Sequence, residues 1–437
     1  MQRIAQLLPL IVLLGSVACA RQESPTETVA SSDRTIIVDG TVVDSRGSQP
    51  IRDGSVVIVG DRITFVGRAV DYPDRDDAQI LDAQGGTILP GFVDAHVHSA
   101  SDPGLRREFL INGVTTVCDL GSPLADMPEF DELYLDADPA ARGYRAGPII
   151  TAPGGLPGAV LDPDLNYEVG SPAEARAAVR DLNQRGADFI KVYIHDGDGA
   201  GAYPMIGQEE LVAIVDEAHK LGLLVRPHVT YASLLSMAIE AGVDVVEHVP
   251  ANVTQAQIES ISEAQWQRIE ESDDPLQLLF EKLYPQFPAQ LEQMVQAGII
   301  MIPTLDRPYG EMFRASDPTV EQRAASGLAL EIVRRYHELG GVVGLGTDFN
   351  VGLGMPAGIP LGEIEMLQAA GLTPMDVIEA GTRHAAEACG QGDQLGTLAP
   401  GMLADIIVVD GDPLQDLGAL SQVVLVIRNG ELGFISE

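Results

Sequence analysis

Lysine is almost missing from this chain, and negative charge dominates it. The 437 residues include 27 basic residues against 64 Asp and Glu, which gives a formal net charge of −37. Only three of the basic residues are lysines, namely Lys191, Lys220 and Lys282. A surface this acidic repels phosphate backbones and anionic lipid headgroups, so nucleic acid is excluded as an expected partner.

Cysteine and tryptophan are also scarce. The three cysteines are Cys19, Cys118 and Cys389, and the single tryptophan is Trp266. Because Cys19 falls in the leader segment described next, the two remaining cysteines predict no disulfide framework. We therefore expect the core alone to hold the fold, and a 437-residue chain that is 45% hydrophobic is long enough to bury one.

The N-terminal residues resemble an export signal. The apolar run Leu7–Leu14 follows Arg3 and is too short to cross a membrane, so residues 1–19 are expected to be a signal peptide. Residues 20–34 are polar and are expected to form a linker.

Two cleavage sites compete in this leader. Val17-Ala18-Cys19 resembles a bacterial lipobox, with Cys19 as the lipidated first residue of the mature chain. Ala18-Cys19-Ala20 also fits an ordinary small-x-small site. The expected location is therefore outside the cytoplasm, either as an outer-membrane or periplasm-facing lipoprotein tethered through Cys19 or as a soluble periplasmic protein.

The two ends of the chain share one sequence pattern. Residues 35–89 and 398–437 contain short apolar runs separated by turn pairs such as Asp39-Gly40, Asp53-Gly54 and Asn429-Gly430. We expect both ends to build one small β-sandwich domain.

Residues 90–397 alternate strand-like apolar runs with helical periodicity, as at Glu209–Leu221 and Glu321–Leu339. This alternation predicts an α/β fold, specifically a (β/α)8 TIM barrel inserted into the β domain. The role of the long insertion Ala251–Gln290, a lid or a decoration, stays open. The expected barrel strands are Phe92–His98, Thr115–Leu120, Pro148–Ala152, Asp188–Ile194, Leu223–Thr230, Val245–Val249, Ile299–Leu305 and Val342–Asp348.

Two histidines end the first of these strands. His96 and His98 are two residues apart, so in a strand both side chains point to one face and can reach one metal ion. Four further polar residues lie in or at the ends of apolar strands: Lys191, His228, His248 and Asp348. Active sites of barrels form at these strand ends.

Each of these residues also has a structural reading. A strand-end histidine can simply be hydrogen bonded, Asp348 can cap a loop, and Lys191 can pair with Asp119 or Asp188. An unpaired ammonium inside a barrel is unfavourable, so Lys191 needs a carboxylate partner, a depressed pKa or covalent modification. We consider the joint coincidence of all these structural readings improbable.

The chain resembles the amidohydrolase superfamily, in the branch related to imidazolonepropionase and the metal-dependent Xaa-Pro dipeptidases. The resemblance covers nearly everything after residue 34. It is carried by Ile88-Leu89-Pro90-Gly91-Phe92-Val93-Asp94-Ala95-His96-Val97-His98, by Gly346-Thr347-Asp348 and by Leu398–Val409.

The resemblance implies two divalent metal ions, with zinc fitting the ligand set best and manganese or cobalt as alternatives. His96 and His98 match ligands of the more buried metal, and His228 and His248 match ligands of the other. Lys191 matches a lysine that this branch carboxylates with CO2 to bridge the metals. Asp348 matches the catalytic aspartate and metal ligand.

Two positions depart from the family pattern. Cys118 stands where many relatives have arginine, which puts the usual support of the metal ligands there in doubt. After the last strand, relatives commonly have Asn-Pro-Ala or a similar run, whereas this chain has Arg383-His384-Ala385-Ala386. His384 is expected to be a supporting or structural residue.

The expected reaction is hydrolysis of an amide bond by a hydroxide held between two metals, with Asp348 as general base and then general acid. The expected substrate is a dipeptide or N-acyl amino acid, with a cyclic amide, an imidazolone-type ring or a lactone as the alternative. A third interpretation is a surface binding protein that performs no catalysis. A homo-oligomer is compatible with all three interpretations. Candidate substrate contacts are Tyr193, His195, Tyr231 and Arg307, with Tyr309 a further residue after the seventh strand.

Overall fold

The computed structural model describes residues 34–72, 74–135, 138–197, 199, 201–272, 274–350, 352 and 354–436. The predicted signal peptide, with Cys19, and the predicted linker up to residue 33 lie outside the described residues. Among the described residues, no helix has both the length and the apolar character needed to cross a membrane.

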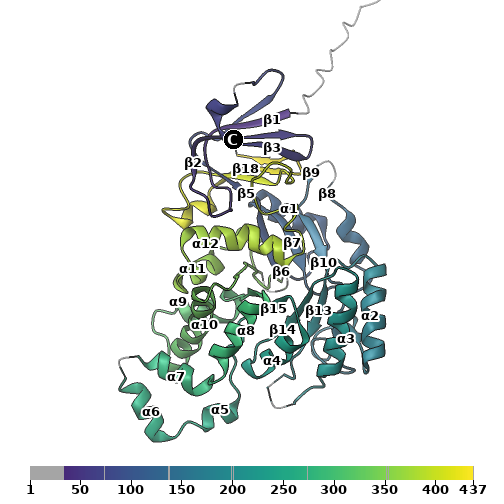
Figure 1. Ribbon diagram of the computed structural model, residues 1–437, viewed down its shortest axis with the longest axis vertical. Coiled ribbons are helices and arrows are strands. Elements are labelled where there is room, and N and C mark those ends of the chain that lie inside the picture. The colour runs from purple at the N-terminus through teal and green to yellow at the C-terminus, as the bar shows by residue number, and fades with distance from the viewer. Residues whose placement is uncertain are drawn as a thin grey trace, which may run out of the picture.

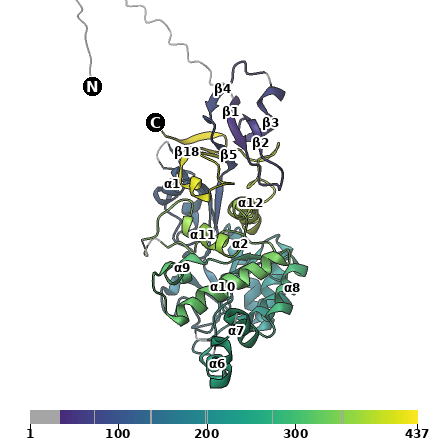
Figure 2. The same cartoon turned by 90° about the vertical axis from the view of Figure 1, so that its left-hand side faces the viewer.

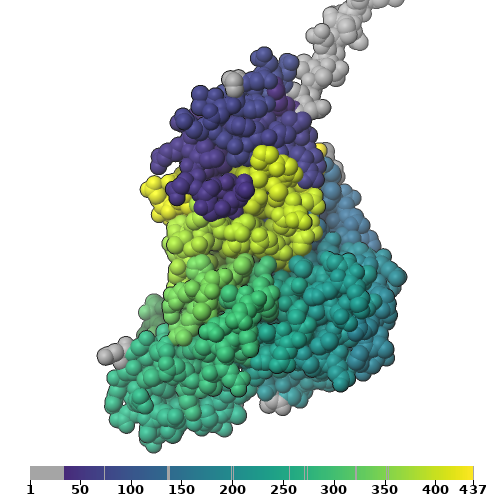
Figure 3. Space-filling model, viewed as in Figure 1, coloured from purple at the N-terminus to yellow at the C-terminus, as the bar shows by residue number. Residues whose placement is uncertain are grey.

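Both ends of the chain contribute strands to one eight-stranded sheet, while the β-sandwich domain expected from the sequence stays a prediction. Its order is β19-β18-β17-β5-β1-β2-β3, with β4 beside β1. Figures 1 and 3 show the C-terminal residues, in yellow, lying against the N-terminal residues, in purple. The strands are β1 (Arg34–Val42), β2 (Ile51–Val59), β3 (Arg62–Arg68), β4 (Gln79–Asp82), β5 (Thr87–Pro90), β17 (Ile406–Val409), β18 (Val423–Arg428) and β19 (Glu431–Ile435).

Strand β5 leads from this sheet into the central part of the chain. It pairs with β1 and β17, and after Gly91 the chain continues directly as β6 (Phe92–Val97). Gly91 allows this close passage, because a Cβ there would lie 2.2 Å from Thr115 Oγ1. The strand that carries His96 is thereby fixed to the sheet made by both chain ends.

The central part is α/β, with parallel strands in two sheets. One has the order β10-β7-β6 and the other β12-β11-β13-β14-β15-β16. A short antiparallel pair, β8 (Tyr134–Leu135) and β9 (Asp138–Pro139), stands apart. The parallel strands after β6 are β7 (Val114–Asp119), β10 (Arg142–Arg145), β11 (Ile149–Thr151), β12 (Asn166–Glu168), β13 (Ile190–Tyr193), β14 (Val225–His228), β15 (Val245–Glu247) and β16 (Ile300–Ile302).

The expected eighth strand, Val342–Asp348, is wrong as a regular strand. The segment forms only single bridges, from Val343 to Met301 and from Phe349 to Val97. It contains Gly344 and Gly346, and a Cβ at Gly346 would lie 2.5 Å from Ile302 Cγ2 and 2.7 Å from His96 Cβ. The segment nevertheless lies between the two sheets, since Gly344 N donates to Met301 O at 2.9 Å and Ala95 N donates to Leu345 O at 3.1 Å. A closed barrel stays a prediction.

Helices follow most of the parallel strands and pack around them. The two helices expected from periodicity are confirmed as α3 and α10, and Figure 2 shows α10 running across the face that α7 and α8 also cover. The α-helices are α1 (Pro103–Ile111), α2 (Pro172–Gln184), α3 (Gln208–Lys220), α4 (Ala232–Ala241), α5 (Gln255–Glu259), α6 (Glu263–Glu270), α7 (Pro275–Leu283), α8 (Phe287–Ala297), α9 (Asp306–Arg314), α10 (Val320–Glu338), α11 (Leu361–Ala369), α12 (Pro374–Glu379) and α13 (Ala385–Ala388).

The insertion 251–290 forms α5, α6, α7 and the start of α8. Figure 1 shows α5 and α6 at the end of the molecule opposite the eight-stranded sheet. Trp266 on α6 is partly buried and packs against the main core. None of the insertion's described residues lines the cavity around His96 and His98.

The expectation that this chain lacks a structural disulfide is wrong. Cys118 on β7 and Cys389, the residue after α13, form a disulfide with a Cα–Cα distance of 6.3 Å and 271 residues of sequence separation. Both cysteines are fully buried. Two cysteines this far apart give no sequence signal of pairing, because only the fold brings β7 and α13 together.

Candidate metal centre

All six residues expected to surround the metals line one cavity of about 180 Å³. Five of them lie in or directly after parallel strands, whose carboxyl ends meet at one edge. His96 lies in β6 and His98 directly follows it, Lys191 lies in β13 and His228 ends β14. His248 directly follows β15, and Asp348 follows Gly346-Thr347. The six are therefore His96, His98, Lys191, His228, His248 and Asp348.

Three of these residues already present ligand atoms to one point. One ligand atom each from His96, His98 and Asp348 lies within 4.8 Å of the other two. The Asp348 Oδ1 atom is 3.5 Å from His96 Nε2 and 3.2 Å from His98 Nε2. Asp348 adopts a left-handed backbone with φ of 55°, which turns its carboxylate out of the strand direction and toward the imidazoles.

The electrostatics of these histidines favour a cation. Burial is the largest cause that lowers the pKa of His96 well below its usual range, and it lowers that of His98 to about 4. Both imidazoles are therefore neutral and carry a free lone pair. Within the described part of the chain, the buried Nε2 of His96 has no hydrogen-bond partner. An imidazole lone pair facing a carboxylate oxygen is the arrangement that a bound cation satisfies.

The other two histidines lie across the cavity. The rings of His228 and His248 have centroids 4.2 Å apart, and His248 lies 4.9 Å from His96. Burial also lowers the pKa of both well below the usual range, so they too are neutral. Thr304 Oγ1 lies 2.8 Å from His248 Nδ1, which leaves Nε2 of His248 as the free ring nitrogen.

Lys191 has none of the partners that the structural readings offered it. Its Nζ is buried and makes no hydrogen bond to any described residue, and burial lowers its pKa to about 7. The Asp119 carboxylate instead accepts from Ala100 N at 2.9 Å, and that of Asp188 accepts from Arg145 N at 2.9 Å. The alternative in which Lys191 pairs with either aspartate is wrong.

The candidate substrate contacts divide into two groups. Tyr193 and Arg307 line the cavity, and the Arg307 guanidinium forms an ion pair with Asp348. His195 and Tyr231 lie one layer behind, with ring centroids 5.3 Å from His228 to His195 and 5.1 Å from His195 to Tyr231. Tyr309 is buried in the core and does not line the cavity.

The departures from the family pattern have structural explanations. His384 lies in a π-helical turn, Ala380–His384, with its Nδ1 2.9 Å from the carbonyl oxygen of Val343. It therefore supports the backbone before Asp348 without lining the cavity. Cys118 is half of the disulfide, and the guanidinium of Arg226 lies beside its partner Cys389, with NH1 3.9 Å from the sulfur.

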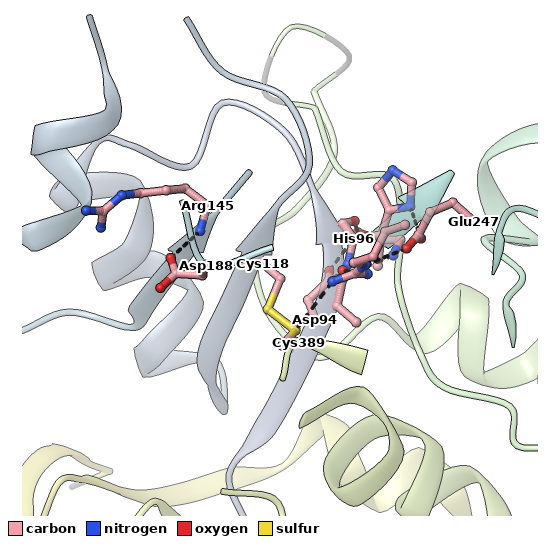
Figure 4. Close-up of a disulfide and its surroundings, with 10 residues drawn as sticks. Asp94, His96, Cys118, Arg145, Asp188, Glu247 and Cys389 are labelled. Atoms are coloured by element: carbon pink, nitrogen blue, oxygen red, sulfur yellow. Dashed lines mark hydrogen bonds and ion pairs between the residues drawn. A yellow bond between two sulfur atoms is a disulfide. The ribbon is translucent and has the colours of Figure 1, made fainter. Parts of the chain in front are cut away.

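Sequence reasoning missed three buried charged residues beneath the ligands. Glu247 contacts His96, Arg226 contacts Glu247, and Asp94 accepts from Thr347 N at 3.0 Å and from Thr347 Oγ1. Figure 4 shows Asp94, His96 and Glu247 on one side of the disulfide. The signal was present, because the argument that singled out Lys191 in an apolar strand applies equally to Arg226 and Glu247.

Known proteins share this fold and its sequence pattern, and they show to which family the chain belongs. It matches the amidohydrolase family over residues 87–433 and therefore belongs to that family. Family membership and the hydrolase names of its relatives make it a hydrolytic enzyme.

Two curated relatives match along almost the whole chain. Ochratoxinase of Aspergillus niger is 25% identical over 502 residues, covering 99% of this chain and 96% of that protein. Imidazolonepropionase of Brevibacillus brevis is 23% identical over 453 residues, covering 94% and 93%. The crystal structure of a Xaa-Pro dipeptidase with bound methionine has a TM-score of 0.69 and 24% identity, and covers 92% of this chain and 100% of its own. The last likeness shows a shared fold.

Proposed function

We propose that this protein is a metal-dependent hydrolase of amide bonds that acts on a dipeptide or an N-acyl amino acid. The observation that supports it most is a pair of buried atoms in one cavity, Nε2 of His96 and Nζ of Lys191, beside two neutral imidazoles. Neither atom has a hydrogen bond to any residue that the structure describes. Groups of this kind are unfavourable in a core unless a ligand satisfies them. The proposal includes a (β/α)8 barrel as the scaffold.

The donor set fits two divalent metals, with zinc as the favoured ion. His96, His98 and Asp348 would hold one, and His228 and His248 the other. Lys191 would join both after carboxylation by CO2, a reaction that needs the neutral amine, and burial lowers its pKa to about 7. When bound, such metals supply a nucleophile at neutral pH and polarise the carbonyl of the substrate.

Asp348 is proposed as the proton carrier. Its carboxylate lies at the cavity wall, 3.2 Å from His98 Nε2, where it can accept the proton of the attacking water. The same carboxylate then returns the proton to the leaving nitrogen. Arg307 pairs with Asp348 and stands 39% exposed, so it is placed to exchange this partner for a carboxylate of the substrate.

The cavity also has apolar lining residues. These are Ile149, Pro157, Leu161 and Leu165, and Leu161 is 72% exposed. An exposed leucine at a cavity mouth is suited to contact an apolar substrate group. We therefore expect an amide substrate with an apolar group on one side and a carboxylate toward Arg307. Tyr193, His195 and Tyr231 would surround His228, a ligand of the second metal.

A cyclic amide or imidazolone-type ring is the second candidate substrate, and a lactone is a less favoured one. The cyclic amide or imidazolone-type ring is supported by the similarity to an imidazolonepropionase over 94% of this chain. A non-catalytic binding protein would not need both Asp348 and a buried lysine without a hydrogen bond to any described residue in one cavity, so we do not favour it.

We further propose that the protein is exported, either tethered through a lipidated Cys19 or free in the periplasm. The Cys118–Cys389 disulfide supports this proposal, because disulfides persist in oxidising compartments. The acidic surface, with a net charge of −37, argues against nucleic acid as a partner.

The test is a substrate screen with metal-loaded protein, beside the Asp348→Asn variant as the inactive control. We expect turnover of dipeptides or N-acyl amino acids, fastest with an apolar residue and a free carboxylate. Turnover of cyclic amides alone would favour the second candidate. A metal-loaded protein that hydrolyses no member of either library would contradict the proposal.

A further inference from the structure

We propose that Glu247 and Arg226 are positioning residues of the metal centre, which hold His96 in the single tautomer that can bind a metal through Nε2. Together with His96 they form what we call the anchoring triad. The proposal rests on the proposed metal-dependent function, but its geometry belongs to the protein alone.

The anchoring triad is a continuous chain of short contacts. His96 Nδ1 lies 2.7 Å from Glu247 Oε2, and Arg226 Nε donates to Glu247 Oε1 at 2.7 Å. All three side chains are at most 1% exposed. Because a carboxylate only accepts hydrogen bonds, the hydrogen of the neutral His96 ring lies on Nδ1 and the lone pair on Nε2.

Arg226 also fixes the backbone that carries His96. Its NH2 group donates to the carbonyl oxygen of Ala95 at 2.6 Å, the residue directly before His96. The guanidinium lies 4.8 Å from the ring centroid of Phe189 and has the Cys389 sulfur 3.9 Å from NH1. Each nitrogen of the guanidinium thus contacts a different residue, namely Glu247, Cys389 or Ala95. Because these contacts fix the guanidinium, its hydrogen bond also holds the Glu247 carboxylate in one orientation.

Stability alone does not explain this pair. A buried ion pair is weak evidence for stability, since the desolvation of both charges offsets their attraction. Lys191 lies opposite Arg226 in the β13–β14 register, and the charge of Arg226 helps to lower the pKa of the Lys191 amine. An apolar pair would fill the same space without the cost of burying two charges. Only the ion pair supplies a carboxylate oxygen in a fixed position, Oε2 of Glu247, that can accept the hydrogen of His96 Nδ1.

Replacing Glu247 by glutamine should therefore invert the tautomer. The Gln oxygen must face the Nε hydrogen of Arg226, because an NH2 group there would oppose another donor. The amide NH2 then faces His96 Nδ1, which must accept, and the hydrogen moves to Nε2. Adding Arg226→Met removes the competing donor, so the amide can turn and accept from Nδ1 again.

The experiment measures the tautomer and the metal together. The His96 ring is assigned by 15N NMR of histidine-labelled, metal-free protein, and metal affinity is measured by competition with a chelator. We expect Nδ1–H in the native protein, Nε2–H with a metal affinity about 10–100-fold lower in Glu247→Gln, and recovery of both in Glu247→Gln/Arg226→Met. The matched control is Arg106→Lys, since Arg106 is also fully buried beside a phenylalanine. Its guanidinium donates to backbone carbonyls, those of Ser101, Glu129, Glu132 and Ala141, which belong to no residue of the triad.

Three results would contradict the proposed role of the triad. They are an unchanged His96 tautomer in folded Glu247→Gln, an unchanged metal affinity of that variant, and an equal loss of metal affinity in Arg106→Lys. If Glu247→Gln does not fold, the double variant Glu247→Gln/Arg226→Met decides. A His96 ring with its hydrogen on Nδ1 would support an acceptor role for residue 247, and a mixture of the two His96 tautomers would contradict it. A native protein that binds no metal would contradict the proposed function, while the NMR measurement would still decide the role of the triad.

Discussion

Replacing Lys191 by methionine should stabilise the metal-free protein. The Lys191 amine is 1% exposed and has no hydrogen-bond partner among the described residues. Burial lowers its pKa from 10.5 to about 7. At about 1.4 kcal/mol per pH unit, this difference corresponds to about 5 kcal/mol that disfavours the charged amine in the folded protein. Methionine has a similar length and carries no charge.

The size of this stabilisation depends on pH. Below pH 7 the amine is protonated in both the folded and the unfolded chain, so the folded protein carries the full unfavourable free energy. Between pH 7 and 10.5 the folded protein has lost the proton and the unfolded chain still holds it, so the free energy of unfolding rises with pH. We therefore expect Lys191→Met to be more stable than the native protein by up to about 5 kcal/mol at pH 6, and by little at pH 10.

Urea unfolding of chelator-treated, CO2-free protein at both pH values measures this difference. The control is Lys220→Met, because the Lys220 side chain is 59% exposed on α3 and should show no such gain. A Lys191→Met protein that is less stable than the native one at pH 6 would refute the reasoning. So would a gain that does not shrink with rising pH.

Three further predictions concern Asp348, Glu363 and the disulfide. Asp348→Asn should keep its metal, measured by elemental analysis, and lose turnover by at least about a thousandfold; full activity would remove Asp348 from its role. Burial raises the pKa of Glu363 from 4.5 to about 8, so native stability should fall as pH rises through that range. Urea unfolding of Glu363→Gln should show a weaker fall, and an identical pH dependence would contradict this. Cys118→Ala/Cys389→Ala should lower the free energy of unfolding by about 2–5 kcal/mol, and dithiothreitol should then affect only the native protein.

The sequence predicted the parts of this site that depend on local pattern. Strand-end position sufficed to place His96, His98, His228 and His248 in one cavity, because parallel strands present their carboxyl ends at one edge. The periodicity of α3 and α10 predicted both helices to within one residue at each end.

The features that the sequence did not predict depend on contacts between distant residues. The Cys118–Cys389 disulfide joins positions 271 residues apart, and Glu247 reaches His96 across 151 residues. The segment 342–348 has the composition of a strand, but its glycines let it pack between two sheets with only single bridges. Spacing along the chain carries no information on such contacts.

Elemental analysis of the purified native protein tests the metal centre most directly. The account predicts about two equivalents of divalent metal per chain, and about none after the four cavity histidines are replaced by alanine. A folded native protein that holds no metal, even after dialysis against zinc and bicarbonate, would contradict it.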